Sequence, residues 1–268
     1  MLFKMNKKIK IKIMKNKKVY VVILTIFSLI FTSCVSNKKM LYFQNVEGVE
    51  TPTVLENYEP KIQKGDLLNI NVSAIDAEAA LPFNIYETPV VGSYTSNLKP
   101  LYYLVNTDGD IQFPVLGTLK VAGFTSKELT KHLNEQLASY INKPIVNIRL
   151  TNFKITVLGE VTKPGTYPVA NERISIIEAI GLAGDLTIQG KRTTVTLVRE
   201  VQGERKFVTI DLTNKKLFNS PYYYLAQNDV IYVEPNKTKI NSSAVGSNAG
   251  LILSSISTLI SLIAILTR

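Results

Sequence analysis

The stretch YYLVNTDGDIQFPVLGTLKVAGFT, residues 102–125, decides how the first part of the folded chain is organised. Its short runs of β-branched and aromatic residues are separated by turn-forming residues, namely Asp108, Gly109, Pro114, Gly117 and Gly123. Asp-Gly supplies the positive φ that a tight turn needs, so the pattern predicts hairpins. Thr125 and Glu128 then form a capping box that opens a helix. We therefore expect a small sheet with a helix packed on it.

The flanking residues extend this unit on both sides. Upstream, the turn residues Gly65 and Asp66 precede GDLLNINV (residues 65–72), whose apolar residues alternate as in a half-buried strand. Downstream, the helix carries one apolar face, formed by Leu129, Leu133, Leu137 and Tyr140. KPIVNIRL (residues 143–150) alternates again and predicts a further strand. The segment 73–100 has three prolines and no clear face, so we expect a loop there.

A second unit of similar composition follows. Strand-like runs flank the turn at Pro164 and Gly165, and a capping box at Ser175 and Glu178 opens a helix that Gly184 ends. Three more strands are predicted, over residues 194–200, 206–212 and 228–235. The last one, NDVIYVEP, echoes GDLLNINV of the first unit, which suggests related small α+β units without proving a repeat. The fold class is therefore α+β.

The N-terminus has the pattern of a secretory signal. Eight lysines and no acidic residue lie between Lys4 and Lys18, followed by the apolar run VYVVILTIFSLIF and a single cysteine, Cys34. Met14 restarts the pattern, so either methionine could be the start. Three fates for Cys34 stay open at this point: chemical modification after signal cleavage, a place beside an uncleaved membrane anchor, or an ordinary core position. Subtracting the eight lysines takes the formal net charge from +10 to +2, so charge alone indicates no nucleic-acid partner.

The carboxyl tail is uncharged from residue 249 to residue 266. At about 1.5 Å per residue a helix of this length reaches about 27 Å, near the thickness of a hydrocarbon core, so we expect a transmembrane helix over residues 249–267. At 100° per residue Ser254, Ser257, Thr258 and Ser261 share one face, and we expect this face to line a pore. A plain second anchor or a buried core helix is the alternative.

The sequence lacks the residues of a catalytic site. His132 is the single histidine and borders the apolar face of a helix, and a lone histidine with a lone cysteine cannot build a zinc or Cys/His site. Asp108 and Asp110 flank a turn glycine, which favours turn formation over metal binding. The three tyrosines 222–224 could stack on sugars, but packing within the fold is the stronger interpretation. We expect no enzyme activity, no metal and no cofactor.

Taken together, these features resemble the Wza-type outer-membrane polysaccharide export lipoproteins. Residues 58–72 and 103–129 resemble the polysaccharide-export domain, and residues 155–186 with 222–235 resemble one soluble-ligand-binding β-grasp (SLBB) unit. Within the first domain the matching residues are Gly65, Asp66, Gly109, Ile111, Pro114, Gly117, Gly123 and Thr125. The resemblance covers about two thirds of the chain and makes Cys34 the lipidated first residue of the mature protein, although Phe31 departs from the usual aliphatic residue.

The resemblance implies a domain order: signal peptide 1–33, lipidated linker 34–57, polysaccharide-export domain 58–152, SLBB β-grasp domain 153–235, linker 236–248 and transmembrane helix 249–267. It also implies an outer-membrane lipoprotein with most of its chain in the periplasm. Identical subunits would form a ring, often of eight, whose terminal helices enclose a channel. Capsular polysaccharide or exopolysaccharide would pass through it passively, with an inner-membrane polysaccharide co-polymerase, often kinase-linked, docking below.

This sequence departs from larger members of that family in having one apparent β-grasp unit, and its tail is less amphipathic. Two other functions stay open. A periplasmic glycan-binding lipoprotein would use the same β-grasp unit but would not explain the tail. An envelope scaffold would explain lipid and helix but needs no export domain. The identity of the sugar and the size of the ring lie beyond what the sequence indicates.

Overall fold

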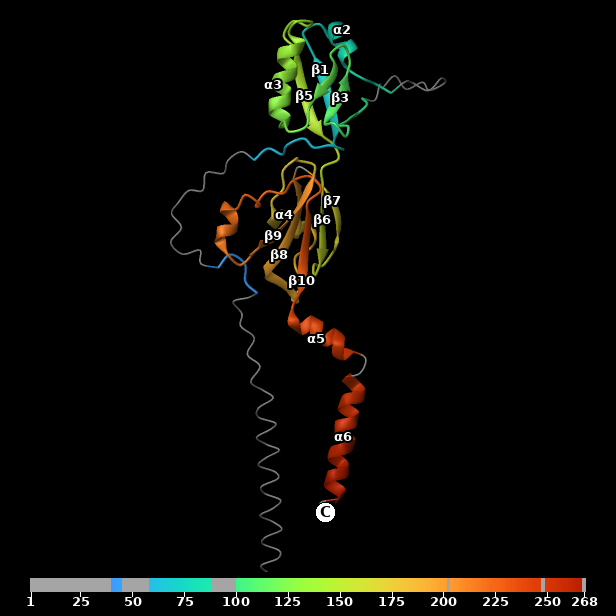
Figure 1. Ribbon diagram of the computed structural model, residues 1–268, viewed down its shortest axis with the longest axis vertical. Coiled ribbons are helices and arrows are strands. Elements are labelled where there is room, and N and C mark those ends of the chain that lie inside the picture. The colour runs from blue at the N-terminus through green and yellow to red at the C-terminus, as the bar shows by residue number, and fades with distance from the viewer. Residues whose placement is uncertain (1–39, 45–57, 88–99, 202, 247–248, 267–268) are drawn as a thin grey trace, which may run out of the picture. The chain divides into compact units, whose positions relative to one another are not determined.

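The computed structural model describes residues 40–44, 58–87, 100–201, 203–246 and 249–266 (Figure 1). The predicted signal peptide, Cys34 and most of the predicted linker 34–57 lie outside these residues. The described strands form three sheets, with strand orders β2-β1-β5, β3-β4 and β7-β6-β10-β8-β9. The fold is mixed α and β, in agreement with the α+β prediction.

The first sheet joins strands that are far apart in the sequence. It consists of β1 (Leu67–Ser73), β2 (Tyr103–Leu104) and β5 (Ile145–Leu150). The antiparallel register of β1 and β5 places Leu68 opposite Leu150 and Ile70 opposite Ile148, so the buried side chains of both strands share one face. This is the alternation that the sequence predicts, because successive side chains of a strand point to opposite faces.

Helix α3 (Ser126–Leu137) packs against β5 of this sheet. Its capping box is formed as predicted: the Thr125 hydroxyl accepts the Glu128 N–H, and the Glu128 carboxylate accepts the Thr125 N–H. Leu129 and Leu133 of this helix are fully buried. The prediction that Tyr140 belongs to the same face is wrong, because the helix ends at Leu137 and the Tyr140 ring is mostly exposed.

The decisive stretch folds somewhat differently from the prediction. Strands β3 (Asp110–Phe113) and β4 (Gly117–Lys120) pair with each other, so the hairpin tip is Pro114 to Leu116. The Asp108-Gly109 turn leads from β2 into β3, and these strands belong to different sheets. Strand β2 pairs with β1 instead, since tertiary packing on β1 decides its partner.

Two predicted irregular segments contain helices. Helix α2 (Ala77–Ala80) and the 3₁₀ turn η2 (Leu81–Phe83) lie in the predicted loop 73–100. The side chain of Asp76 caps α2, and the buried Phe83 anchors η2 in the core. Helix α5 (Lys237–Val245) replaces the predicted linker 236–248, because Asn236 supplies a side-chain cap that accepts the Lys239 N–H.

The second domain is built on the five-stranded sheet. Its elements are β6 (Lys154–Gly159), β7 (Gly165–Pro168), α4 (Ile176–Leu182), β8 (Gly190–Val201), β9 (Glu204–Ile210), the 3₁₀ turn η3 (Lys215–Asn219) and β10 (Val230–Pro235). Strand β10 runs parallel to β6 and antiparallel to β8. Gly159 is required there, since a Cβ at this position would lie 2.1 Å from the Val233 carbonyl oxygen. The capping box of α4 is also formed as predicted.

A short segment of the predicted linker packs on this second domain. The backbone N–H groups of Phe43 and Gln44 donate to the carbonyls of Leu212 and Thr213. The Phe43 ring also packs against Phe218, at 5.2 Å between ring centroids. We call residues 40–44 the strap.

Helix α6 (Ala249–Leu266) follows α5. Its 18 residues would reach about 27 Å, slightly less than the ~30 Å of a hydrocarbon core. Among the described residues no helix combines the length and apolarity needed to cross a membrane. The predicted transmembrane helix over residues 249–267 is therefore not supported.

Candidate functional site: the junction of the two domains

Each domain begins its central strand with the same turn. In the first, Gly65 has φ +84° and precedes the buried Asp66; in the second, Asn228 has φ +63° and precedes the buried Asp229. Each aspartate carboxylate accepts the backbone N–H three residues earlier, from Gln63 at 2.7 Å and from Ala226 at 2.8 Å. The echo between GDLLNINV and NDVIYVEP therefore corresponds to one local structure that occurs twice.

The two aspartates differ in their partners. Arg199 binds Asp229 with two nitrogens, Nε at 3.0 Å and Nη2 at 2.6 Å, and the pair is almost completely buried. The guanidinium also donates to the Tyr224 carbonyl and lies over the Tyr222 ring. Asp66 has no such cation, and its Oδ1 accepts no hydrogen bond among the described residues.

Burial raises the pKa of Asp66 to about 6, and the Gln63 N–H and the Gln227 amide oppose this increase. An unpaired carboxylate in a low-dielectric site favours its protonated form, because ionisation would leave a poorly solvated charge. The negative charge of Asp66 at the start of β1 therefore destabilises the folded state.

Hydrogen bonds from three side chains connect the domains. Asn152 accepts the Leu67 N–H and donates to the Gly65 carbonyl. Gln227 accepts the Lys154 N–H and donates to the Asn152 carbonyl. Asn152 binds backbone on both sides of the turn at Gly65, and Gln227 of the second domain binds the Asn152 carbonyl, so the two amides together connect the start of β1 to the second domain.

Glu172 adds a third connection. It has φ +55°, an unusual conformation for a non-glycine residue, and its carboxylate accepts the Leu150 N–H at 2.6 Å and the Ser126 hydroxyl at 3.3 Å. Leu150 ends β5 and Ser126 begins α3, so one carboxylate ties a loop of the second domain to two elements of the first. Backbone strain of this kind often marks a functional position.

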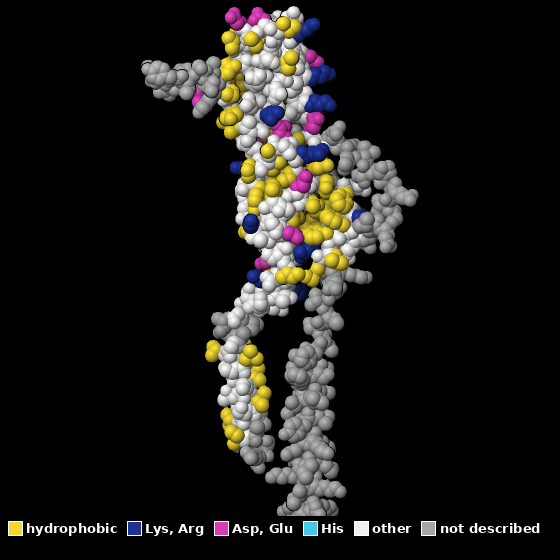
Figure 2. Space-filling view, turned by 180° about the vertical axis from the view of Figure 1, so that it is seen from behind, with side chains coloured by type: hydrophobic (Ala, Val, Ile, Leu, Met, Phe, Trp, Pro, Cys, Tyr) yellow, Lys and Arg dark blue, Asp and Glu magenta, His cyan; other side chains and the backbone are white. Residues whose placement is uncertain are grey.

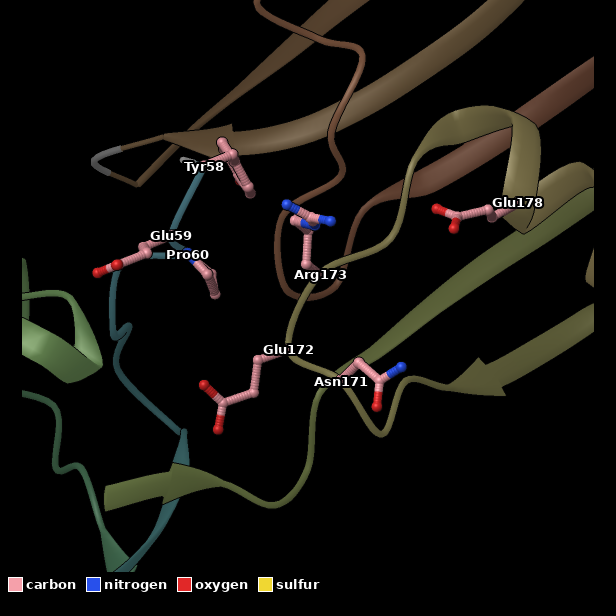
Figure 3. A pocket seen from close by; sticks show the side chains of 7 residues that line it. All are labelled: Tyr58, Glu59, Pro60, Asn171, Glu172, Arg173 and Glu178. Carbon is pink, nitrogen blue, oxygen red and sulfur yellow. The ribbon is translucent and has the colours of Figure 1, made fainter. Parts of the chain in front are cut away.

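A hollow of about 430 Å³ opens beside this connection (Figure 3). Its lining combines aromatic, cationic, amide and carboxylate groups, namely Tyr58, Glu59, Pro60, Asn171, Glu172, Arg173 and Glu178. The Tyr58 ring stacks on Tyr224 at 5.2 Å, and the Arg173 guanidinium lies over the Tyr224 ring at 5.2 Å.

The groups around the hollow can bind hydroxyl-rich ligands but do not form a catalytic arrangement. Glu178 is held in the capping box of α4, and Glu172 is held by backbone, so neither is positioned as a free acid or base. Arg173 forms no ion pair with another described residue, which leaves its N–H donors available. Among the described residues no group of three side chains could hold a metal ion.

The predicted turn residues occupy several different places. Gly65, Gly109, Gly117 and Gly123 all have positive φ, whereas Gly165 does not and instead begins β7. Only Gly65 and Asp66 of this set belong to the junction. Gly109 contributes to the first domain alone: its carbonyl accepts the N–H groups of Val121 and Ala122, and a Cβ there would lie 2.7 Å from the Ala122 Cβ.

The predicted pore-lining residues lie on α6, away from this junction in the sequence. The Thr258 hydroxyl donates to the Ser254 carbonyl and the Ser261 hydroxyl to the Ser257 carbonyl. These hydroxyls satisfy themselves within the helix, so the stripe is compatible with water or with close helix packing. Cys34, the predicted lipidation site, lies outside the described residues.

Comparison with known proteins agrees with the order of the two domains. Residues 54–151 match the family described as polysaccharide biosynthesis/export protein, and residues 154–209 match the SLBB domain. The boundary between the two matches falls at Asn152 and Phe153, where the connecting hydrogen bonds begin. Over these two segments the chain is similar to polysaccharide export proteins that carry an SLBB domain. This confirms the resemblance drawn from the glycine turns.

Curated relatives of this chain carry corresponding names. The EPS I polysaccharide export outer membrane protein EpsA of Ralstonia solanacearum is 26% identical over 199 residues, covering 71% of this chain and 52% of the relative. EpsA of Ralstonia nicotianae is 31% identical over 161 residues, covering 57% and 42%. The exopolysaccharide production protein ExoF of Rhizobium meliloti is 27% identical over 88 residues, covering 31% and 21%. The chain thus spans about half the length of the EpsA relatives, and these names describe export and no reaction.

Sequence reasoning missed most of the junction. The pairing of Arg199 with Asp229 and the contacts of Glu172 join residues 22 to 46 positions apart, and no periodicity reports such pairs. One signal was present in the sequence. The echo of Gly65-Asp66 in Asn228-Asp229 indicates a shared turn, since asparagine is the residue after glycine that best tolerates positive φ.

Proposed function

We propose that this protein is an outer-membrane, lipid-anchored subunit of an oligomeric ring that exports capsular polysaccharide or exopolysaccharide by passive translocation. The observation that carries the proposal is the order of its parts: an export domain, one SLBB domain joined to it by side-chain hydrogen bonds, and then the apolar helix α6. Relatives named as outer-membrane export proteins support the location. Passive translocation of a polymer requires a binding surface and a channel, and it requires no catalytic group.

The exposure of α6 supports assembly. Its apolar side chains are at least half exposed at most described positions, for example Leu253 at 68% and Leu259 at 62% (Figure 2). A soluble monomer rarely leaves so much apolar surface uncovered, so lipid or neighbouring copies are expected to cover it. Several α6 helices side by side would bury Leu253, Ile256 and Leu259 and turn the stripe of Ser254, Ser257, Thr258 and Ser261 toward a common lumen. Each helix satisfies its own backbone hydrogen bonds, so single helices suffice to build such a passage.

The junction gives the ring a rigid building block in this proposal. The amides of Asn152 and Gln227 and the carboxylate of Glu172 limit rotation between the domains, so neighbouring subunits can meet both domains in one fixed arrangement. An inner-membrane polysaccharide co-polymerase, often kinase-linked, would dock on the periplasmic side and deliver the polymer.

Electron microscopy of the detergent-extracted full chain tests the proposal. Closed rings with a central hole are expected, together with loss of exported polymer from cells that lack the protein. Particles without a hole, in cells whose export still depends on the protein, would contradict the channel function and favour an envelope scaffold.

A second candidate function, periplasmic glycan binding without translocation, is favoured by the hollow beside Tyr58 and Arg173. A chain that ends at residue 246 separates the two. The channel proposal expects export to be lost while the truncated protein stays folded, and glycan retention without translocation expects function to be kept.

A further inference from the structure

The strap, which follows the predicted lipidation site, and helix α5, which leads to the apolar helix α6, leave the second domain at the same end. The loop that begins at Asp185 and the start of β8 contact the strap, because Tyr42 donates its hydroxyl hydrogen to Asp185 and Arg192 lies over the Tyr42 ring at 5.2 Å. The same loop contacts the start of α5, since the Asn236 N–H donates to the Gln189 carbonyl at 2.7 Å. Figure 1 shows α5 leaving the domain at the end of β10. We call this surface the anchor end.

The distance along the chain to the proposed lipid is short. Met40 begins the strap six residues after Cys34, and six extended residues reach at most about 20 Å. On the other side α5 leads within a few residues into the exposed apolar α6. A lipid attached at Cys34 would therefore hold the anchor end close to the membrane surface.

The anchor end combines exposed apolar side chains with unpaired lysines. Leu41 is 58% exposed, Ile188 66% and Ile240 51%, although they come from three different segments. Its acidic side chains are already engaged: Asp185 with Tyr42, Glu234 with Lys191 at 2.7 Å, and Asp211 with Thr213.

Lys237 and Lys239 have no interaction within the described part of the fold that accounts for their positive charges. They lie in the first turn of α5, which contains no acidic residue, and neither forms an ion pair with another described residue. Cations at a helix N-terminus oppose the helix dipole, so the fold gains nothing from them. Residues that break a local rule without a local gain commonly serve a function.

We propose that the anchor end is a membrane-docking surface, with Leu41, Ile188 and Ile240 entering the headgroup layer and Lys237 and Lys239 binding the phosphates of anionic phospholipids. Apolar side chains with lysines beside them are the composition that holds protein surfaces at a lipid interface. Docking would set the height and tilt of each subunit, in addition to the tether at Cys34. The proposal rests on the membrane anchoring given under the proposed function.

The test places a spin label at residue 188 or 240 of the full chain, through Ile188→Cys or Ile240→Cys with Cys34 retained, since a lipidated thiol does not take the label, and reconstitutes it into vesicles. The control label is at residue 75, since Ile75 is 79% exposed and belongs to the first domain. In vesicles containing phosphatidylglycerol, accessibility to a water-soluble nickel complex should fall about threefold or more at 188 and 240 relative to 75. Lys237→Gln with Lys239→Gln should remove most of that difference, while the matched pair Lys127→Gln with Lys131→Gln on α3 should leave it.

Equal nickel accessibility at 188, 240 and 75 in vesicle-bound protein would overturn the proposal. Protection that persists in lipid-free detergent rings would also overturn it, since a neighbouring copy or another protein region would then cover the surface. Failure of the chain to associate with any vesicle would instead contradict the membrane anchoring of the proposed function. Rings that export normally with a water-exposed anchor end would reject the docking surface alone.

Discussion

Asp66 and Asp229 occupy the same turn in two domains, yet only Asp229 is neutralised by a cation. Both are 1% exposed, and both accept the N–H three residues earlier. Arg199 satisfies Asp229 at 2.6 Å, whereas Oδ1 of Asp66 has no partner among the described residues. The same substitution should therefore have opposite effects at the two positions.

Asp66→Asn should stabilise the protein at pH 7.5 by about 1–2 kcal/mol more than it does at pH 5. The folded-state pKa of Asp66, about 6, lies above its ordinary value of 3.8. The folded state therefore binds the proton more tightly, and this carboxyl lowers stability as pH rises from about 4 to above 6. Thermal unfolding of both proteins in the same detergent between pH 5 and pH 7.5 measures the difference. A constant difference across that range would contradict the assignment to Asp66.

Asp229→Asn should destabilise the second domain by about 3–5 kcal/mol, because it leaves the Arg199 guanidinium buried without a counter-charge. Replacing both members, as in Asp229→Asn with Arg199→Met, should recover part of the loss. Glu234→Gln is the matched control: its pair with Lys191 is partly exposed, so the loss should stay below about 1 kcal/mol. Chemical unfolding followed by circular dichroism gives all three values, and equal losses at 229 and 234 would count against the buried pair.

Gly109→Val should abolish assembled protein. The position has φ +88°, and a Cβ there would meet the Ala122 Cβ at 2.7 Å. Gly181→Val serves as control, since Gly181 lies on α4 with open space around it and without positive φ. Yield of rings after detergent extraction is the measurement. A normal yield for Gly109→Val would show that the turn tolerates a side chain.

Ser254→Asp and Ser261→Asp should still assemble and export, perturbing chiefly the passage of acidic glycans, whereas Ile256→Asp should fail. In the proposed ring, a charge on a lipid-facing side would cost about 2.5–3.5 kcal/mol per helix, and much less where it faces water. In a Cys34-retaining background, cysteines at 254 and 261 should react with a membrane-impermeant thiol reagent, and a cysteine at 256 should not. If aspartate abolished assembly at all three positions and no cysteine reacted with the reagent, α6 would be a packed anchor and not the lining of a channel.

Cys34 should carry the lipid. A palmitate analogue supplied to cells should label the wild-type chain and leave Cys34→Ser unlabelled, because the modification requires the thiol. Cells expressing a serine variant of a residue outside the signal, Thr53→Ser, provide the control for expression. Equal labelling of wild type and Cys34→Ser would reject the assignment.

Elements whose signals are local could be predicted from the amino-acid sequence alone. Alternation in β1 and β5 and the capping boxes at Thr125 and Ser175 depend on side chains two to four residues apart, so they could be read directly. The repeated turn before Asp66 and Asp229 was visible for the same reason. The family followed from the spacing of these local features.

Tertiary structure decided what depends on partners far along the chain. Strand β2 pairs with β1 instead of β3, the strap binds the second domain, and Glu172 reaches Leu150 and Ser126, because burial and hydrogen bonding reward these contacts only after the sheets have formed. The same holds for the charge of the two aspartates. Asp66 and Asp229 share their local sequence pattern, and only the position of Arg199 in the folded sheet gives Asp229 a buried cation as partner and leaves Asp66 without one among the described residues.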